Sequence, residues 1–140
     1  MKKGSFQHYE HPSDIGIRGV GESREEAFRQ AALAMTAAMA EIVSVKPEKE
    51  IDIEVEMEDD QLGLVDWLNA ILYEISVKKM LFCDFEVSIH GRKLTAKVWG
   101  EKIDKNRHKP VVEVKAATYS DLKVEKNKEG NWIAQCIIDV

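Results

Sequence analysis

The stretch Ile51-Asp52-Ile53-Glu54-Val55-Glu56-Met57-Glu58 alternates apolar and acidic residues without a break. Because successive side chains of a strand point to opposite faces, this alternation predicts a strand with one buried face and one acidic, solvent-exposed face. The next run, from Leu62 to Val77, places its large apolar side chains at helical spacing instead. A strand followed directly by a long helix points to a fold that mixes both kinds of element.

A second long helix is predicted upstream, where a capping box marks its start. The side chains of Ser23 and Glu26 can each bond to the main-chain amide of the other residue. One helical face then carries Phe28, Ala32, Met35, Met39 and Ile42. Pro47 sets the outer limit of this helix. Its many alanines keep it narrow, so we expect it to lie close to a sheet.

The remaining residues are predicted to form strands. These are residues 6–9 and 15–20 around a polar turn, 85–89 and 94–98 around a turn at His90-Gly91, a strand from Val112 to near Tyr119, one from Leu122, and one from Trp132 to the end of the sequence. We therefore predict a single α+β domain over residues 1–140. In this two-layer fold, two long helices pack on one face of a mostly antiparallel sheet.

The composition and charge disfavour two classes of protein, free-standing nucleic-acid-binding proteins and membrane-spanning proteins. The chain has 140 residues, of which 44% are hydrophobic, and a net charge of −5. A free-standing nucleic-acid-binding protein usually carries a basic stripe, and none is visible in the linear sequence, although distant charges can still gather on folding. No apolar run is long enough to span a membrane. We expect a soluble, cytoplasmic protein in which Cys83 and Cys136 are reduced thiols.

Two acidic segments are candidate metal sites. The first, Glu10-His11-Pro12-Ser13-Asp14, joins two acids and an imidazole in one turn, although the same residues also suit an ordinary turn. The second is Asp139-Val140. The Asp139 side chain, its carbonyl and the terminal carboxylate of Val140 are hard oxygen ligands of the kind that calcium or magnesium prefers.

A third candidate is the loop Asp104-Lys105-Asn106-Arg107-His108-Lys109, with Lys115 a few residues further on. A structural loop is the simpler interpretation, and contact with a phosphate or an acidic partner is the alternative. Signals for a conventional nucleophile or for a glycine-rich phosphate loop are missing from the sequence. This favours a protein that is not an enzyme.

Four stretches, in order, make the chain resemble the archease family. They are His11-Pro12-Ser13-Asp14-Ile15-Gly16-Ile17; Glu25-Glu26-Ala27-Phe28 with Ala31-Ala32-Leu33-Ala34-Met35; Asp66-Trp67-Leu68-Asn69-Ala70-Ile71-Leu72-Tyr73; and Arg107-His108 followed by Val114-Lys115-Ala116-Ala117-Thr118-Tyr119 and Ile138-Asp139-Val140. The family usually has Asp where this chain has Glu10, and Thr-Ala where it has Pro12-Ser13. The departure leaves a role for the first acid in doubt.

The resemblance implies a non-enzymatic protein cofactor in tRNA splicing. Such proteins promote guanylylation and multiple turnover of a GTP-dependent tRNA-splicing RNA ligase and broaden its nucleotide use, and tRNA is an indirect partner through the ligase. The resemblance also implies a calcium site, with magnesium or manganese left open, whose ligands map onto Asp14, Asp139 and Val140. Residues of a possible partner-contact loop are Glu10, His11, Arg107, His108 and Lys115.

Two other functions stay open on the residues alone. The first is a small metal-dependent hydrolase that uses Asp14, His11 and Asp139. The second is an RNA-binding or chaperone-like module, which the net charge of −5 disfavours.

Overall fold

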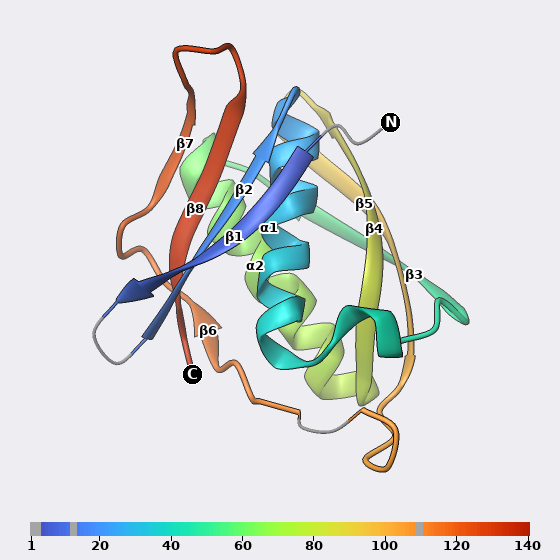
Figure 1. Cartoon of the computed structure of the whole chain (residues 1–140). Coiled ribbons are helices and arrows are strands. Elements are labelled where there is room, and N and C mark those ends of the chain that lie inside the picture. The colour runs from blue at the N-terminus through green and yellow to red at the C-terminus, as the bar shows by residue number, and fades with distance from the viewer. Residues whose placement is uncertain (1–3, 12–13, 109–110) are drawn as a thin grey trace.

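The computed structural model describes residues 4–11, 14–108 and 111–140. Within these residues the long helices are α1 (Arg24–Met39) and α2 (Asp60–Lys78), and a short 3-10 turn, η1 (Ile42–Ser44), follows α1 (Figure 1). The strands are β1 (Gly4–His11), β2 (Asp14–Gly21), β3 (Lys49–Glu56), β4 (Met80–His90), β5 (Lys93–Lys102), β6 (Ala116–Ala117), β7 (Lys123–Lys126) and β8 (Trp132–Asp139).

The strands form two antiparallel sheets. In the large sheet the order is β1-β2-β8-β6, and β7 also pairs with β8. In the small sheet the order is β3-β5-β4. The hairpins β1–β2 and β4–β5 join strands that are neighbours in sequence, whereas β2 and β8 come from opposite ends of the chain. The last strand in sequence, β8, is therefore an inner strand of the large sheet.

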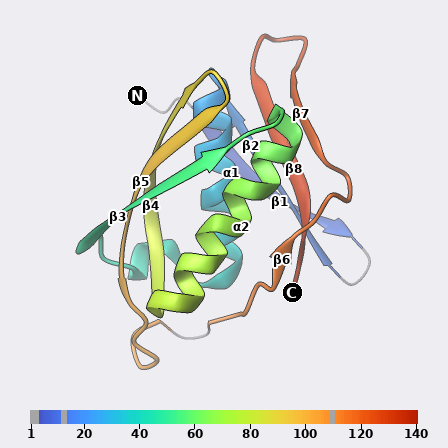
Figure 2. The ribbon, with the colours of Figure 1, turned by 180° about the vertical axis from the view of Figure 1, so that it is seen from behind.

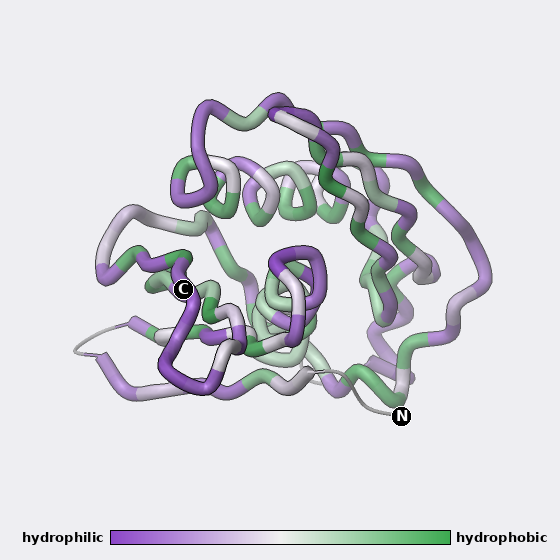
Figure 3. Tube along the Cα trace, turned by 90° about the horizontal axis from the view of Figure 1, so that it is seen from above, coloured by the Kyte–Doolittle hydropathy of each residue, from purple (hydrophilic) through white to green (hydrophobic). Residues whose placement is uncertain are grey.

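Helix α1 lies at the centre of the molecule, enclosed by the two sheets and α2 (Figure 3). Its Ala27, Ala31 and Ala34 are completely buried. These small side chains let a strand approach very closely: a Cβ atom added to Gly19 of β2 would lie 2.3 Å from the carbonyl oxygen of Ala27. The alanine-rich sequence of α1 is thus explained by close packing on the large sheet.

The predicted α+β class is confirmed, with two long helices and predominantly antiparallel strands. The strands differ from the prediction in one respect, because they divide into two sheets and α1 packs between them. The alternation of apolar residues shows which face of a strand is buried, but it does not identify the neighbouring strand. The pattern of apolar residues therefore could not predict that two sheets enclose one helix.

Helix α2 covers the small sheet on one side and approaches β6 on the other (Figure 2). Asp59 caps its start by accepting a hydrogen bond from the amide of Leu62 at 2.8 Å. Trp67 is fully buried and donates from Nε1 to the carbonyl of Phe28 at 3.1 Å, which ties α2 to α1. No helix in the described ranges is long and apolar enough to cross a membrane.

Three predicted elements are shorter than their apolar patterns. Strand β3 ends at Glu56, before Met57 and Glu58 of the alternating run. Helix α1 stops at Met39, and Ile42 belongs to the 3-10 turn. Val112 and Val114 precede a strand of only two residues, β6. The amide of Val112 donates to the carbonyl of Met39 at 2.8 Å, so this segment satisfies part of its main chain at the end of α1 instead of along a strand.

Candidate metal and partner-contact site

Asp14 and Asp139 lie at the same end of the large sheet. Asp14 is the first residue of β2, and Asp139 is the last residue of β8. The two strands pair in register as far as Ile15 opposite Ile138, and Asp14 and Asp139 are the next residue of each strand. Continuing the register by one residue would set the two Asp side chains on the same face of the sheet. Two acids from opposite ends of the sequence thus lie at the same strand ends.

Strand β6 holds the end of β8 in place. The amide of Lys115 donates to the carbonyl of Asp139 at 2.7 Å, and Ala116 pairs with Asp139. Strand β6 is itself fixed by α2, because the Asn69 side chain donates to the carbonyl of Ala117 at 3.3 Å and accepts from its amide at 2.9 Å. The end of β8 is therefore ordered by contacts that begin on a helix.

His11 and Glu10, the other candidates of the N-terminal turn, point to opposite faces of the large sheet. His11 pairs with Asp14 and shares its face, which is the face turned away from α1. Glu10 pairs with Ile15 and lies on the other face. The His11 side chain is thus the one that accompanies Asp14. The candidates Pro12 and Ser13 lie outside the described residues.

The paired carboxylates suit a cation with a preference for oxygen ligands. Like charges directly opposite each other destabilise a sheet, and a bound cation would relieve that repulsion. In the described ranges no group of three or more His, Cys, Asp or Glu side chains gathers in metal-binding geometry. The two Asp side chains would therefore need main-chain or terminal oxygens to complete a coordination shell, which is what the predicted set with Val140 supplies.

A hydrogen-bonded brace that the sequence analysis missed lies beside these acids. The hydroxyl of Tyr9 donates to Asp121 at 2.7 Å, and the Arg18 guanidinium stacks 4.6 Å from the Tyr9 ring centroid. Burial and the bond to Asp121 raise the pKa of Tyr9, so its hydroxyl stays protonated and can donate. A side chain at Gly16 would collide with the Tyr9 ring. The brace ties the β1–β2 hairpin to the loop after β6.

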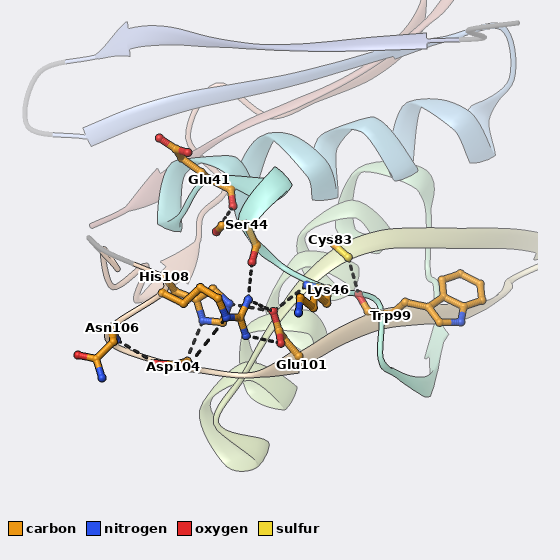
Figure 4. Close-up of polar contacts among 10 residues, drawn as sticks. Glu41, Ser44, Lys46, Cys83, Trp99, Glu101, Asp104, Asn106 and His108 are labelled. Carbon is orange, nitrogen blue, oxygen red and sulfur yellow. Dashed lines mark hydrogen bonds and ion pairs between the residues drawn. The ribbon is translucent and has the colours of Figure 1, made fainter.

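Arg107 and His108 lie apart from this site, around the buried carboxylate of Glu101 (Figure 4). Arg107 donates to both Glu101 oxygens at 2.6 and 2.8 Å, and His108 contacts one of them through Nε2 at 2.9 Å. The amide of Lys46 donates to the same carboxylate at 2.7 Å. His108 has an exposed fraction of 1%, so its ring is enclosed by the protein.

The charges around Glu101 fix the protonation pattern of this cluster. Hydrogen bonding to Arg107, opposed by burial and assisted by the Lys46 amide, lowers the pKa of Glu101 to about 2. The amide of Asp104 donates to Nδ1 of His108 at 2.8 Å, which leaves Nε2 as the nitrogen that donates to Glu101. Glu101 therefore fixes the loop that follows β5. The one sequence signal for this role is the position of Glu101 near the end of a strand.

Neither thiol is placed for nucleophilic chemistry. Cys136 is fully buried, and burial raises its pKa to about 12. Burial also raises the pKa of Cys83, whose sulfur lies 3.6 Å from the carbonyl of Trp99. Since the thiolate is the reactive form, burial disfavours the nucleophilic state of both side chains.

The fold and the paired acids together define a two-sheet α+β protein whose candidate site lies at the strand ends of its large sheet. Comparison with known proteins then identifies the group. A sequence model of the archease protein family matches residues 6–140, and the chain belongs to this family.

Individual archeases of other organisms are similar to this chain over almost its whole length. The chain is 42% identical over 139 residues to protein archease of Pyrococcus abyssi, with 96% of this chain and 98% of the relative covered. Protein archease of Pyrococcus furiosus gives the same identity and coverage. The solution structure of Methanobacterium thermoautotrophicum protein 1598 matches with a TM-score of 0.84 and 28% identity, covering 97% of this chain and 99% of that one.

Proposed function

We propose that this protein is a non-enzymatic cofactor of a GTP-dependent tRNA-splicing RNA ligase in the cytoplasm. It promotes guanylylation and multiple turnover of the ligase, broadens the nucleotides that the ligase accepts, and meets tRNA through the ligase. Membership of the archease family supports this proposal. The structural observation that supports it is the β2–β8 register, which places Asp14 and Asp139 at the same end of the large sheet, where Asp139 is exposed.

Asp14, Asp139 and Val140 would hold a calcium ion at this end of the large sheet, here called the acidic tip. The ion would supply positive charge next to a carboxylate-rich surface. Asp139 and Val140 are exposed, so the tip can enter a cleft of a partner. The tip acts by binding one arrangement of the ligase active site more tightly than another, which shifts the ligase toward the arrangement that accepts the guanylyl group.

Calcium binding is tested by isothermal titration calorimetry on three single variants. Asp14→Asn and Asp139→Asn keep the size of the side chain and remove a charged ligand, and each is expected to weaken calcium binding at least tenfold. Glu54→Gln removes an exposed acid of β3, far from the tip, and serves as the matched control. Equal affinity for all three variants would contradict the ligand assignment.

The function is tested by counting ligations per ligase molecule with and without the protein. The wild-type protein is expected to raise the count above one, and both Asp variants are expected to remain near one. A count that stays at one with the wild-type protein would refute the proposal. Hydrolysis of nucleotides by this protein alone would instead favour the small metal-dependent hydrolase.

A further inference from the structure

Three segments meet at one end of the molecule (Figures 1 and 2). They are residues 45–49, which lead into β3, residues 74–79 at the C-terminal end of α2, and residues 101–108, which end β5 and form the loop after it. Lys102 Nζ donates to the carbonyl of Lys78 at 2.9 Å, and the amide of Ile103 donates to the carbonyl of Lys79 at 2.9 Å. The Lys46 amide reaches Glu101 at 2.7 Å. The basic side chains of these segments, here called the basic end, are Lys46, Lys49, Lys78, Lys79, Lys102, Lys105 and Arg107.

The basic end carries a charge opposite to that of the whole chain. All seven of its basic side chains are exposed, and the same segments hold four acids, Glu48, Glu74, Glu101 and Asp104. The local charge is thus +3, within a chain of net charge −5. Glu101 is buried and already bound to Arg107, and Glu74 is paired with Lys78 at 3.4 Å. Folding therefore gathers basic side chains at one end of the molecule, although acidic and basic residues are interspersed along the sequence.

The basic end is held in one shape. Glu101 binds the Lys46 amide, Arg107 and His108 at once, so it fixes the loop after β5 against the approach to β3. Lys49, Lys102, Lys105 and Arg107 line one hollow at this position, together with Glu48, Glu101 and Asp104. A surface whose backbone is already fixed loses less conformational entropy when it binds than a mobile loop would.

The position of the basic end relative to Asp14 and Asp139 is also informative. The chain runs from the basic end through residues 111–115 to β6, which pairs with Asp139, and both regions lie toward the same end of the molecule (Figure 1). A molecule that presents this end to the ligase would thus turn both regions toward the ligase. This step rests on the proposed function.

We propose that the basic end binds the sugar–phosphate backbone of RNA without reading its sequence. Six of its seven basic residues are lysines. Lysine is a common phosphate ligand, whereas protein–protein interfaces are depleted in lysine and enriched in arginine and aromatic residues. The chemistry of the patch therefore fits an RNA strand better than it fits the acidic surface of a protein. The RNA beside the ligase active site is the strand to be joined.

The expected affinity is modest and depends on salt. Backbone contacts release counterions, and for single strands the slope of log K against log salt is about −0.7 per phosphate contacted. Three or four contacts give a slope of about −2 to −3. We expect the protein alone to bind a single-stranded RNA 20-mer weakly at 50 mM salt and to lose most of that binding at 200 mM.

The test measures fluorescence anisotropy of a labelled single-stranded RNA 20-mer, with no ligase present. The triple variant Lys46→Glu, Lys49→Glu and Lys105→Glu is expected to lose at least tenfold in affinity at 50 mM salt and to flatten the salt slope by about 2. The matched control changes three exposed lysines on and after β7, Lys123→Glu, Lys126→Glu and Lys128→Glu, and alters the net charge equally. It is expected to bind like the wild type.

Neutral substitutions, Lys49→Gln with Lys105→Gln, repeat the test without added repulsion in case the triple variant unfolds. No binding by the wild type, or equal loss in both triple variants, would overturn the proposal. Intact RNA binding combined with lost ligase stimulation would assign the basic end to a protein surface instead. Because the anisotropy assay contains no ligase, its failure leaves the ligase proposal standing, and failure of the Asp14 and Asp139 tests leaves RNA binding to be judged separately.

Discussion

Replacing Glu101 by Gln should destabilise the protein through the cluster that Glu101 organises. The substitution keeps the shape of the side chain and removes its charge. Glu101 accepts hydrogen bonds from Arg107, His108 and the Lys46 amide, and its exposed fraction is 4%. A glutamine has one acceptor oxygen for these donors, and its own NH₂ group would face the others.

The size of the loss follows from the pKa of Glu101. A carboxyl whose pKa falls from 4.5 to about 2 on folding contributes roughly 3 kcal/mol to stability at neutral pH. The side chain of Arg107 is 38% exposed, and solvent screening there reduces the contribution to about 2 kcal/mol. With a slope near 2 kcal/mol per molar urea, the unfolding midpoint should fall by about 1 M.

Urea unfolding at several pH values tests the cause as well as the size. Because folding lowers the pKa of Glu101, its contribution is fully present above about pH 4.5 and is lost as the pH falls toward 2. The difference between wild type and variant should therefore shrink below pH 4.5. The matched control is Glu50→Gln, an exposed acid 3.1 Å from Lys97, expected to change stability by less than about 0.5 kcal/mol. A loss below 1 kcal/mol for Glu101→Gln, or one that does not change with pH, would refute the reasoning.

Three further predictions concern the packing of the fold and of the site. Gly100→Ala should destabilise by about 3 kcal/mol or more, measured by urea unfolding, because the new Cβ would overlap the carbonyl oxygen of Leu81. Asn69→Ala removes both hydrogen bonds to Ala117 and should weaken calcium binding at the tip severalfold in calorimetry; unchanged affinity would show that β6 holds its position without α2. Ser23→Ala should cost about 1 kcal/mol in thermal unfolding, since Ser23 caps α1 by accepting from the Glu26 amide at 3.1 Å.

Local patterns predicted most of the elements. The alternation at Ile51–Glu58 became β3, and the turn at His90-Gly91 joins β4 to β5, with Gly91 at a φ of 62°. The capping box also predicted the helix start, although only the Ser23 half of it forms; the Glu26 side chain binds Arg29 and Gln30 instead. These features depend on residues that lie close together in sequence, and sequence patterns describe such features well.

Features that depend on pairing between segments distant in sequence could not be predicted from sequence patterns. The apolar residues Val112 and Val114 predicted a strand, but this segment bonds to the end of α1. The two-sheet arrangement depends on β2 choosing β8 as its neighbour, and periodicity carries no information about that choice. The same pairing brings Asp14 beside Asp139, so the residues of the candidate site came from resemblance and their proximity came from the structure.

The pairing of β2 with β8 also has a consequence for synthesis. Strand β8 occupies an inner position of the large sheet, yet it is synthesised after every other described strand. Until it emerges, the β1–β2 hairpin lacks its partner, and the part of α1 that packs on β8 remains open to water. A nascent chain that stalls before Trp132 would therefore expose a ready target for chaperones and proteases.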